Sequence, residues 1–305
     1  MGRSWMIGVD LGGTKTEVIL MDRQSREHFR ARKDTPVGDY AGTLDTICQL
    51  VAAAEAHAGA QALSVGVGIP GSVSRVTGRV KNGNSTWLNG HRMAEDLGAL
   101  LGRRVTLSND ANCLALSEAA DGAGQGYRVV LAVILGTGCG SGISVNGHLL
   151  AGPNGVAGEW GHNPLPWTAG NELHKRPCFC GQSGCVETFV SGPGFALSHR
   201  LLGGDLLSPR DIVEAARGGD ARSTATLNNY IDQLARGLAG VINVLDPDVI
   251  VLGGGMSNID EIYARLPQRL PAWVFGGECD TPVLKAVHGD SSGVRGAAWL
   301  GAQEG

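Results

Sequence analysis

The chain has 305 residues, of which 43% are hydrophobic and 18% are charged, and its formal net charge is −4. This composition is typical of a folded globular enzyme and excludes a disordered chain, and the length favours two domains. The small negative charge excludes a general attraction to nucleic acid or to anionic membranes, so any bound phosphate has to be held by individual amides and ions.

The first part of the chain alternates predicted strands and helices. Strands are expected over Trp5–Asp10 and Thr16–Met21, with a glycine-containing turn between them. A helix is expected over Asp39–Ala58, because its apolar residues return to one face. Further elements follow in the same alternation: strands over Leu63–Ile69 and Val105–Leu107, and a helix over Asp110–Ala120. This order indicates an α/β fold.

The order strand, glycine turn, strand occurs a second time, with strands over Val129–Leu135 and Ser141–Val145 around the turn Gly136–Gly140. Two such hairpins suggest a duplicated architecture with a cleft between two halves. The remaining elements are a long amphipathic helix over Thr226–Leu245, a short buried strand over Val249–Leu252 and a last helix over Gly293–Leu300.

No apolar run is long enough to span a membrane, and the first residues lead into a strand rather than a signal peptide, so we expect a cytoplasmic protein. In a reducing compartment its seven cysteines are expected to be thiols or metal ligands. We expect a small α/β domain over residues 1–111 plus 290–305. A larger one with a zinc-binding loop is expected over residues 112–289.

The two glycine turns are candidate phosphate sites. The first leads into a strand and not a helix, which excludes a dinucleotide-binding motif. Its exposed amides can instead hold phosphate oxygens, and Asp10 can hold Mg²⁺ through water. A single turn of this kind is more often an ordinary hairpin, but the second copy favours an ATP site. The predicted ATP residues are Asp10, Gly12, Gly13, Thr14, Lys15, Gly136, Thr137, Gly138 and Gly140.

A third glycine cluster, Gly253, Gly254 and Gly255, follows a predicted buried strand. It is a candidate site for the adenosine part of ATP, and a plain helix-entry turn is an equally good interpretation.

A metal site is predicted from Cys178, Cys180 and Cys185, with His162 upstream. Three cysteines and one histidine form a complete tetrahedral set for Zn²⁺ with no position left for water, which is typical of a structural site. His174 competes with His162 for the fourth position.

Three carboxylates are candidates for contact with a substrate. Asp110 lies where a strand becomes a helix, so it is either a helix N-cap or the base that accepts the proton of an attacking hydroxyl in phosphoryl transfer. Glu159, close to His162, and Glu187, close to Cys185, can form a wall that binds a polyhydroxylated substrate. The alternative for Glu187 is a hydrogen-bonded partner of the metal ligands.

These residues together resemble the ROK family (repressors, open reading frames, kinases), and within it the bacterial fructokinases that also accept mannose. The resemblance covers essentially the whole chain. It depends on the motifs DLGGTKTEVI, GIPG, SNDANC, GTGCG, GEWGHNPLPW, CFCGQSGCVE and LDPDVIVLGGG.

The resemblance implies a two-domain actin-like (ribonuclease H-like) fold, dimerisation, and ATP-dependent phosphorylation of a hexose, with D-fructose as the first choice. Glucokinase, mannokinase and N-acetylhexosamine kinase activities are the alternatives. Asp110 is then the base that activates the primary hydroxyl. The implied sugar-binding residues are Gly71, Asn84, Asn109, Asp110, Glu159, His162 and Glu187.

Two other classes of function fit the sequence less well. The same family contains sugar-sensing repressors, but the first strand begins too early for a preceding DNA-binding segment, and the charge gives no nucleic-acid footprint. A chaperone-type or filament-type ATPase is disfavoured by the predicted zinc loop.

Overall fold

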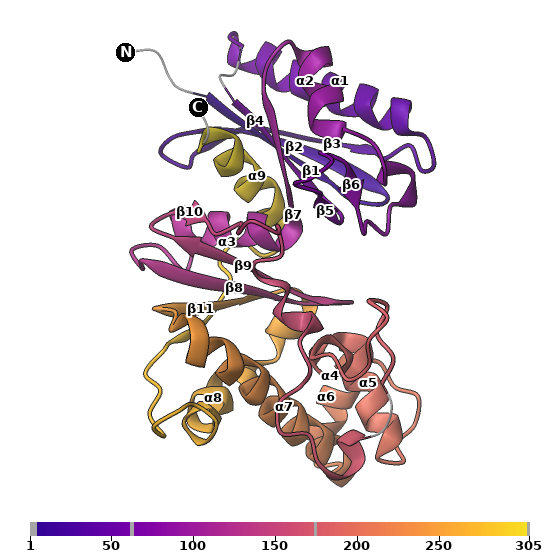
Figure 1. Cartoon of the computed structure of the whole chain (residues 1–305), viewed down its shortest axis with the longest axis vertical. Helices are drawn as coiled ribbons and strands as arrows, with labels where there is room; N and C mark the ends of the chain where they lie inside the picture. Colours follow the sequence, from indigo (N-terminus) through magenta and orange to yellow (C-terminus); the bar gives the residue numbers. More distant parts are fainter. Residues whose placement is uncertain (1–4, 62–63, 174–175, 304–305) are drawn as a thin grey trace. The chain divides into compact units, whose positions relative to one another are not determined.

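The computed structural model describes residues 5–61, 64–173 and 176–303 (Figure 1). The chain divides into two compact units. The first consists of residues 1–126, 142–157 and 287–305, and the second of residues 127–141 and 158–286. Leu63, at which a strand was predicted to begin, and His174, the competing metal ligand, lie outside the described residues.

The first unit is built on a five-stranded sheet with the order β3-β2-β1-β4-β7. Strands β1, β2 and β3 form an antiparallel meander, and β4 and β7 are parallel to β1 and to each other. Its main elements are β1 (Trp5–Leu11), β2 (Lys15–Asp22), β3 (Glu27–Asp34), α1 (Tyr40–Ala58), β4 (Ser64–Ile69), β5 (Ser72–Val73), β6 (Val80–Lys81), α2 (Met93–Leu101), β7 (Val105–Asn109), α3 (Asp110–Asp121), β10 (His148–Leu149) and α9 (Ser292–Ala302).

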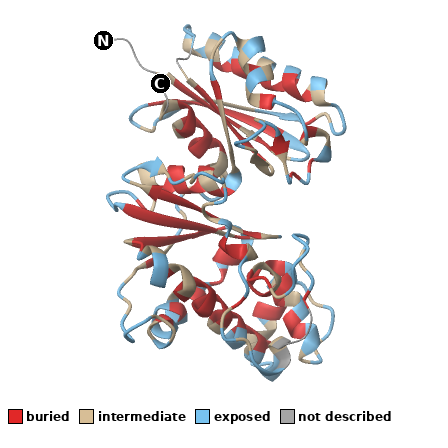
Figure 2. Ribbon diagram, viewed as in Figure 1, coloured by how far each residue is buried: buried red, intermediate tan, exposed pale blue. Residues whose placement is uncertain are grey.

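Both faces of this sheet are covered by helices (Figures 1 and 2). On one face Ile7 and Val9 pack with Leu44 and Ile47 of α1. On the other face residues of β1 and β2 pack with α9, and the residues of this smaller cluster are Met6, Ile19, Met21, Val294 and Ala298. The alternation of side chains along β1 and β2 therefore supplies two apolar cores.

Helix α9 lies directly against strand backbone. A Cβ atom on Gly8 of β1 would lie 2.0 Å from the Val294 carbonyl oxygen, and one on Gly66 of β4 would lie 1.9 Å from that of Ala297. Within α9, a Cβ on Gly296 would lie 1.8 Å from the carbonyl oxygen of Cys113 in α3. Glycine is required at all three positions, because any side chain would separate the packed backbones.

The second unit contains β8 (Val129–Leu135), β11 (Val249–Gly253) and β12 (Val283–Lys285), which are parallel. These strands belong to a sheet with the order β10-β9-β8-β11-β12, in which β9 is Cys139–Val145. The helices of this unit are α4 (Glu187–Val190), α5 (Gly192–Leu201), α6 (Pro209–Arg217), α7 (Ala221–Leu245) and α8 (Asp260–Arg269).

The observed units differ from the predicted domain boundaries. Residues 112–126, which include most of helix α3, and residues 142–157 belong to the first unit, whereas the prediction placed them in the larger domain. The reason is the packing of α3 on α9, including the contact of Gly296 with Cys113. Within the described residues, no helix is both long and apolar enough to cross a lipid bilayer.

Candidate active site

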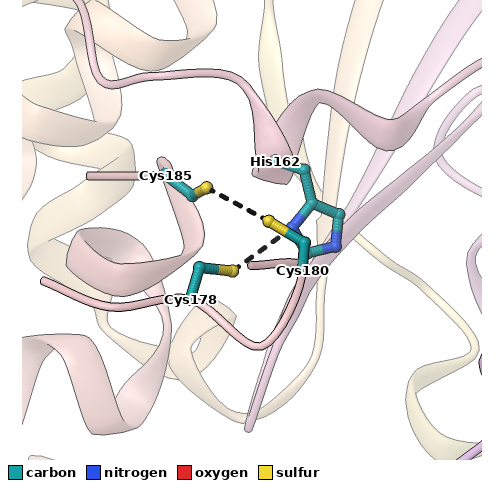
Figure 3. A group of neighbouring side chains, drawn as sticks. All are labelled: His162, Cys178, Cys180 and Cys185. Carbon is teal, nitrogen blue, oxygen red and sulfur yellow. Dashed lines mark hydrogen bonds between the residues drawn. The ribbon is translucent and has the colours of Figure 1, made fainter. Parts of the chain in front are cut away.

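The four predicted metal ligands come together in the second unit (Figure 3). One donor atom from each of His162, Cys178, Cys180 and Cys185 lies within 4.8 Å of the others. His162 ends the short 3-10 helix Glu159–His162, and the cysteines lie on the loop that leads into α4. The spacing in the sequence therefore predicted a real spatial cluster.

The geometry of this cluster fits a tetrahedral ion. Zn²⁺ bonds of about 2.3 Å to sulfur and about 2.0–2.1 Å to nitrogen place two sulfur ligands about 3.8 Å apart and a sulfur and a nitrogen about 3.5 Å apart. The Cys180 and Cys185 sulfurs are separated by 3.7 Å, and the Cys178 sulfur lies 3.5 Å from His162 Nδ1. The four donor groups and these two donor–donor distances thus fit a zinc site in which Nδ1 is the ligand nitrogen.

The other nitrogen of His162 faces a carboxylate. His162 Nε2 lies 4.0 Å from Glu159 Oε2, and the Glu159 side chain is 42% exposed. The two glycines of this segment are required by packing, because a Cβ on Gly158 would lie 2.2 Å from the Ser141 carbonyl oxygen and one on Gly161 would lie 1.9 Å from that of Cys139. The segment is therefore seated on the start of β9.

Glu187 joins the metal cluster to the second glycine turn. Its Oε2 accepts a hydrogen bond of 2.9 Å from the Cys139 backbone N–H, and its Oε1 lies 3.8 Å from the Cys178 sulfur. These contacts correspond to the alternative interpretation of Glu187 as a partner of the metal ligands. They leave its predicted sugar contact as a proposal.

A cavity of about 880 Å³ opens beside the same turn. Gly136 and Thr137 line it together with the start of α5, with α6 and with the 3-10 helix Gly255–Asn258. This volume suits an adenosine-sized ligand. Gly255 thus both lines the cavity and begins a helical turn. Gly254 has a φ of 81°, and a Cβ on it would lie 2.5 Å from the Leu135 carbonyl oxygen.

Much of the wall of this cavity was not predicted from the sequence. Helix α6 contributes Ser208, Pro209, Arg210, Val213, Glu214 and Arg217. A usable signal was present, since Ser208 is the N-cap of α6 and accepts from Asp211 N–H, and Pro209 occupies the first turn.

In the first unit, Asp10 and Asp110 form an acidic pair. Burial raises the pKa of Asp10 to about 6, and the nearby charges of Asp110 and Glu17 add to this effect, whereas Arg32 opposes it. Asp110 is exposed, yet the surrounding protein removes enough water from its carboxyl to raise its pKa as well. A divalent cation would relieve this repulsion, and oxygen donors suit Mg²⁺.

The N-cap of α3 is Asn109 and not Asp110. The Asn109 side chain accepts from the Asn112 backbone N–H at 2.9 Å. Asp110 is the first helical residue, and its Oδ1 accepts from Ala111 N–H at 2.8 Å. The sequence left open whether Asp110 is a helix N-cap or a catalytic base, and the N-cap is Asn109.

The first glycine turn is braced by Thr35, whose backbone N–H donates to Thr14 and whose hydroxyl donates to the Gly12 carbonyl. Gly13 lies beside Ser85, as a Cβ on Gly13 would be 3.6 Å from Ser85 Oγ. Lys15 is exposed and lies 4.0 Å from Asp34. The turn is thus next to the loop that carries Asn84.

The loop of Asn84 is also held by Gly71 and Asn89. Gly71 has a φ of 91°, and a Cβ on it would lie 2.6 Å from Gly83 N. The Asn89 side chain makes two hydrogen bonds of 3.0 Å to the backbone of Gly83. Asn84 itself is exposed. Gly71 therefore acts through the backbone of this loop, and Asn89 is a supporting residue that the sequence analysis missed.

The predicted ATP and sugar residues fall into both units. The first unit contains Asp10, Gly12, Gly13, Thr14, Lys15, Gly71, Asn84, Asn109 and Asp110. The second contains Gly136, Thr137, Gly138, Gly140, Glu159, His162, Glu187, Gly253, Gly254 and Gly255.

Residues 6–304 match the ROK family. The chain is 41% identical over 297 residues to an N-acetyl-D-glucosamine kinase from Pectobacterium atrosepticum, which covers 96% of this chain and 97% of the relative. An N-acetyl-D-glucosamine kinase from Salmonella heidelberg is 39% identical over the same length, covering 96% of this chain and 98% of the relative.

Solved structures agree with this assignment. A ROK hexokinase from Thermus thermophilus superimposes with a TM-score of 0.87 at 27% identity, covering 98% of each chain. A ROK glucokinase from Streptomyces griseus, in complex with glucose and AMPPNP, gives 0.76 at 29% identity, covering 98% of this chain and 99% of that chain. The chain belongs to the ROK family, and its fold is the two-domain actin-like α/β fold of the sugar kinases in that family. The relatives do not support the predicted branch, since they are named N-acetyl-D-glucosamine kinases and not fructokinases.

Proposed function

We propose that the protein is an ATP-dependent kinase that phosphorylates N-acetyl-D-glucosamine at its primary hydroxyl. The observation that carries this proposal is the 41% identity, over nearly the whole of both chains, to an N-acetyl-D-glucosamine kinase. The alternative substrate class of the sequence analysis thereby replaces fructose as the first choice.

Asp110 is the proposed general base. Asp110 is exposed, is not the N-cap and is the first residue of helix α3. In the reaction, an Asp110 oxygen accepts the proton of the sugar hydroxyl while the sugar oxygen bonds to the γ-phosphorus of ATP and ADP leaves. Positioning and charge stabilisation dominate such phosphoryl transfers, and one carboxylate orients the nucleophile.

The proposal assigns the phosphates of ATP to two glycine turns, Gly12–Lys15 and Gly136–Gly140, whose backbone N–H groups suit anionic oxygens. The adenosine part is assigned to the cavity beside Gly255. Asp10 would hold Mg²⁺ through water, and Mg²⁺ would neutralise the charge that develops on the phosphates.

Sugar contacts are assigned to exposed or half-buried polar groups. Those of the first unit are Asn84 and Asn109, with Gly71 shaping the loop. Those of the second unit are Glu159, His162 and Glu187. Zn²⁺ bound at His162 Nδ1 would leave Nε2 directed toward Glu159. The metal would hold this segment in place and take no part in the chemistry, because four protein ligands leave no open position.

The test is a panel of sugars with ATP and Mg²⁺, scored by ADP release. The panel contains N-acetyl-D-glucosamine, N-acetyl-D-mannosamine, D-glucose, D-mannose and D-fructose. The proposal expects the highest kcat/KM for N-acetyl-D-glucosamine. Preference for fructose would restore the first sequence-based choice, and sugar-independent ATP consumption would reject the kinase assignment.

A further inference from the structure

Glu187 occupies a junction between three parts of the second unit. It begins α4, two residues after Cys185. Its Oε2 accepts from the backbone N–H of Cys139, at the end of the glycine turn, and its Oε1 lies against the Cys178 sulfur. One carboxylate therefore touches both the metal loop and the turn that we assign to ATP.

The glycine turn is shaped around this carboxylate. A Cβ on Gly138 would lie 2.8 Å from Glu187 Oε2 and 3.7 Å from its carboxyl carbon, so a side chain at Gly138 would displace Glu187. At the other end of the turn, the Gly136 carbonyl accepts from Gly192 N–H at 2.8 Å. The turn is thus fixed at one end by α5 and at the other by Glu187, with the cavity-lining Thr137 between them.

Cys139 extends this junction to the segment of His162. Its N–H is held by Glu187, while its carbonyl oxygen is so close to Gly161 that only glycine fits there. His162 follows directly and supplies the fourth ligand of the metal cluster. The backbone of Cys139 therefore lies between Glu187 and Gly161, each of which is within two residues of a metal ligand.

A metal would fix both neighbours of Glu187 at once. The Cys178 thiol donates to its carboxylate at 3.8 Å, a proton that metal binding removes, and Cys185 precedes it by two residues in the chain. The separations of 3.5 Å and 3.7 Å between these ligands are those expected around a bound ion, and the sulfur contacts themselves are weak. Metal–thiolate and metal–imidazole bonds would hold the four ligands as a rigid tetrahedron. The orientation of the Glu187 carboxylate then depends on metal occupancy.

We propose that Glu187 is a positioning residue for nucleotide binding, and that it transmits metal occupancy of the His162/Cys178/Cys180/Cys185 site to the Gly136–Gly140 turn. This inference rests on the proposed assignment of that turn to ATP. It differs from a sugar-binding role for Glu187, because it predicts a change in nucleotide affinity when no sugar is present.

The experiment measures binding of AMPPNP with Mg²⁺ by calorimetry in the absence of sugar. The proteins are the wild-type chain, Glu187→Ala, Glu187→Gln and Glu278→Gln, each loaded with zinc, with the metal content measured. Glu278 is an exposed carboxylate of the same unit and serves as the matched charge-removal control. Wild type and Glu187→Ala are then measured again after zinc removal, with circular dichroism to verify folding.

We expect Glu187→Ala to bind AMPPNP about ten- to a hundredfold more weakly than wild type, the effect of a lost hydrogen bond to a charged group. Glu187→Gln keeps an oxygen that accepts from Cys139 N–H and should recover most of the loss, and Glu278→Gln should match wild type. Zinc removal should weaken binding in wild type and have little further effect in Glu187→Ala.

Three results overturn the inference: zinc-loaded Glu187→Ala that binds like wild type, Glu187→Gln that is as impaired as Glu187→Ala, or equal weakening of both proteins by zinc removal. If zinc removal unfolds the chain, the metal acts on the whole fold and not through Glu187, which overturns the transmission of metal occupancy, and the zinc-loaded variants then test only the positioning role of Glu187. Failure of wild type itself to bind AMPPNP would reject the proposed function and this inference with it.

Discussion

Replacement of Asp110 by asparagine separates catalysis from structure. Asp110→Asn keeps the size of the side chain and an oxygen that can accept from Ala111 N–H at the observed 2.8 Å. The helix N-cap, Asn109, is untouched. The change therefore removes a charge and a proton acceptor, and little else.

We expect turnover to fall about 100- to 10,000-fold, the usual contribution of one general base. This corresponds to about 2.7–5.5 kcal/mol of activation free energy. The free energy of unfolding should not fall by more than about 0.5 kcal/mol, because the variant keeps the hydrogen bond to Ala111 and removes the repulsion between Asp110 and Asp10. Asn109→Ala is the contrasting variant, since loss of the cap should cost about 0.5–2 kcal/mol of stability.

The assay is ADP release with N-acetyl-D-glucosamine and ATP, with kcat and KM determined separately and stability measured by urea unfolding. Turnover close to wild type in Asp110→Asn would refute the assignment of the base. A large loss of stability in this variant would show that the carboxylate has a structural role that we have overlooked.

Four further outcomes are expected. Cys178→Ser should lose bound zinc and unfold at a lower temperature, as measured by metal analysis and thermal melting; full zinc retention would exclude Cys178 as a ligand. The pKa of His288 is raised above 6.5, chiefly by its hydrogen bond to Asp121, so its stabilising effect is complete below pH 6.5 and is lost as the pH rises through the raised pKa. The unfolding free energy of wild type should therefore decline over that range, whereas that of His288→Gln should not. Gly296→Ala should lower the free energy of unfolding by about 3 kcal/mol or more, because its Cβ would overlap the Cys113 carbonyl. The control is Gly240→Ala in α7, whose Cβ would lie 3.9 Å from Pro166 and which should be neutral or stabilising. Denaturant unfolding measures both variants. Ala196→Phe places a ring into the cavity and should raise KM for ATP by about tenfold or more, with the KM for the sugar unchanged, as measured by steady-state kinetics. An unchanged KM for ATP would show that the nucleotide does not bind in this cavity.

Elements with strong local signals were predicted well from the sequence. Helix α1 begins after the N-cap Asp39, whose side chain accepts from Gly42 N–H, and it is followed by Gly59, which has a left-handed conformation. Both signals are local in the sequence. Strand β3 was missed because its sequence, EHFRARKD, is mostly charged. Half-buried Arg30 and exposed Arg32 both pair with buried Glu17 of β2, and a periodicity argument cannot detect such a partner.

The candidate site divides in the same way. The metal cluster was predictable because three of its four ligands lie within eight residues and their chemistry is specific. The bond between Glu187 and Cys139 joins positions 48 residues apart, so no local pattern indicates it. The sequence motifs also could not predict which sugar is the substrate, since discrimination between hexoses depends on contacts with individual hydroxyl and acetamido groups.

The packing of α9 has a consequence for biosynthesis. One face of the β1–β2–β4 sheet is covered by residues 292–302, which leave the ribosome after every residue of the second unit. Although domains generally fold in order from the N-terminus, the first unit of this protein therefore completes its core last. Until then the backbones of Gly8 and Gly66 remain exposed to water, and the second unit can already be folded.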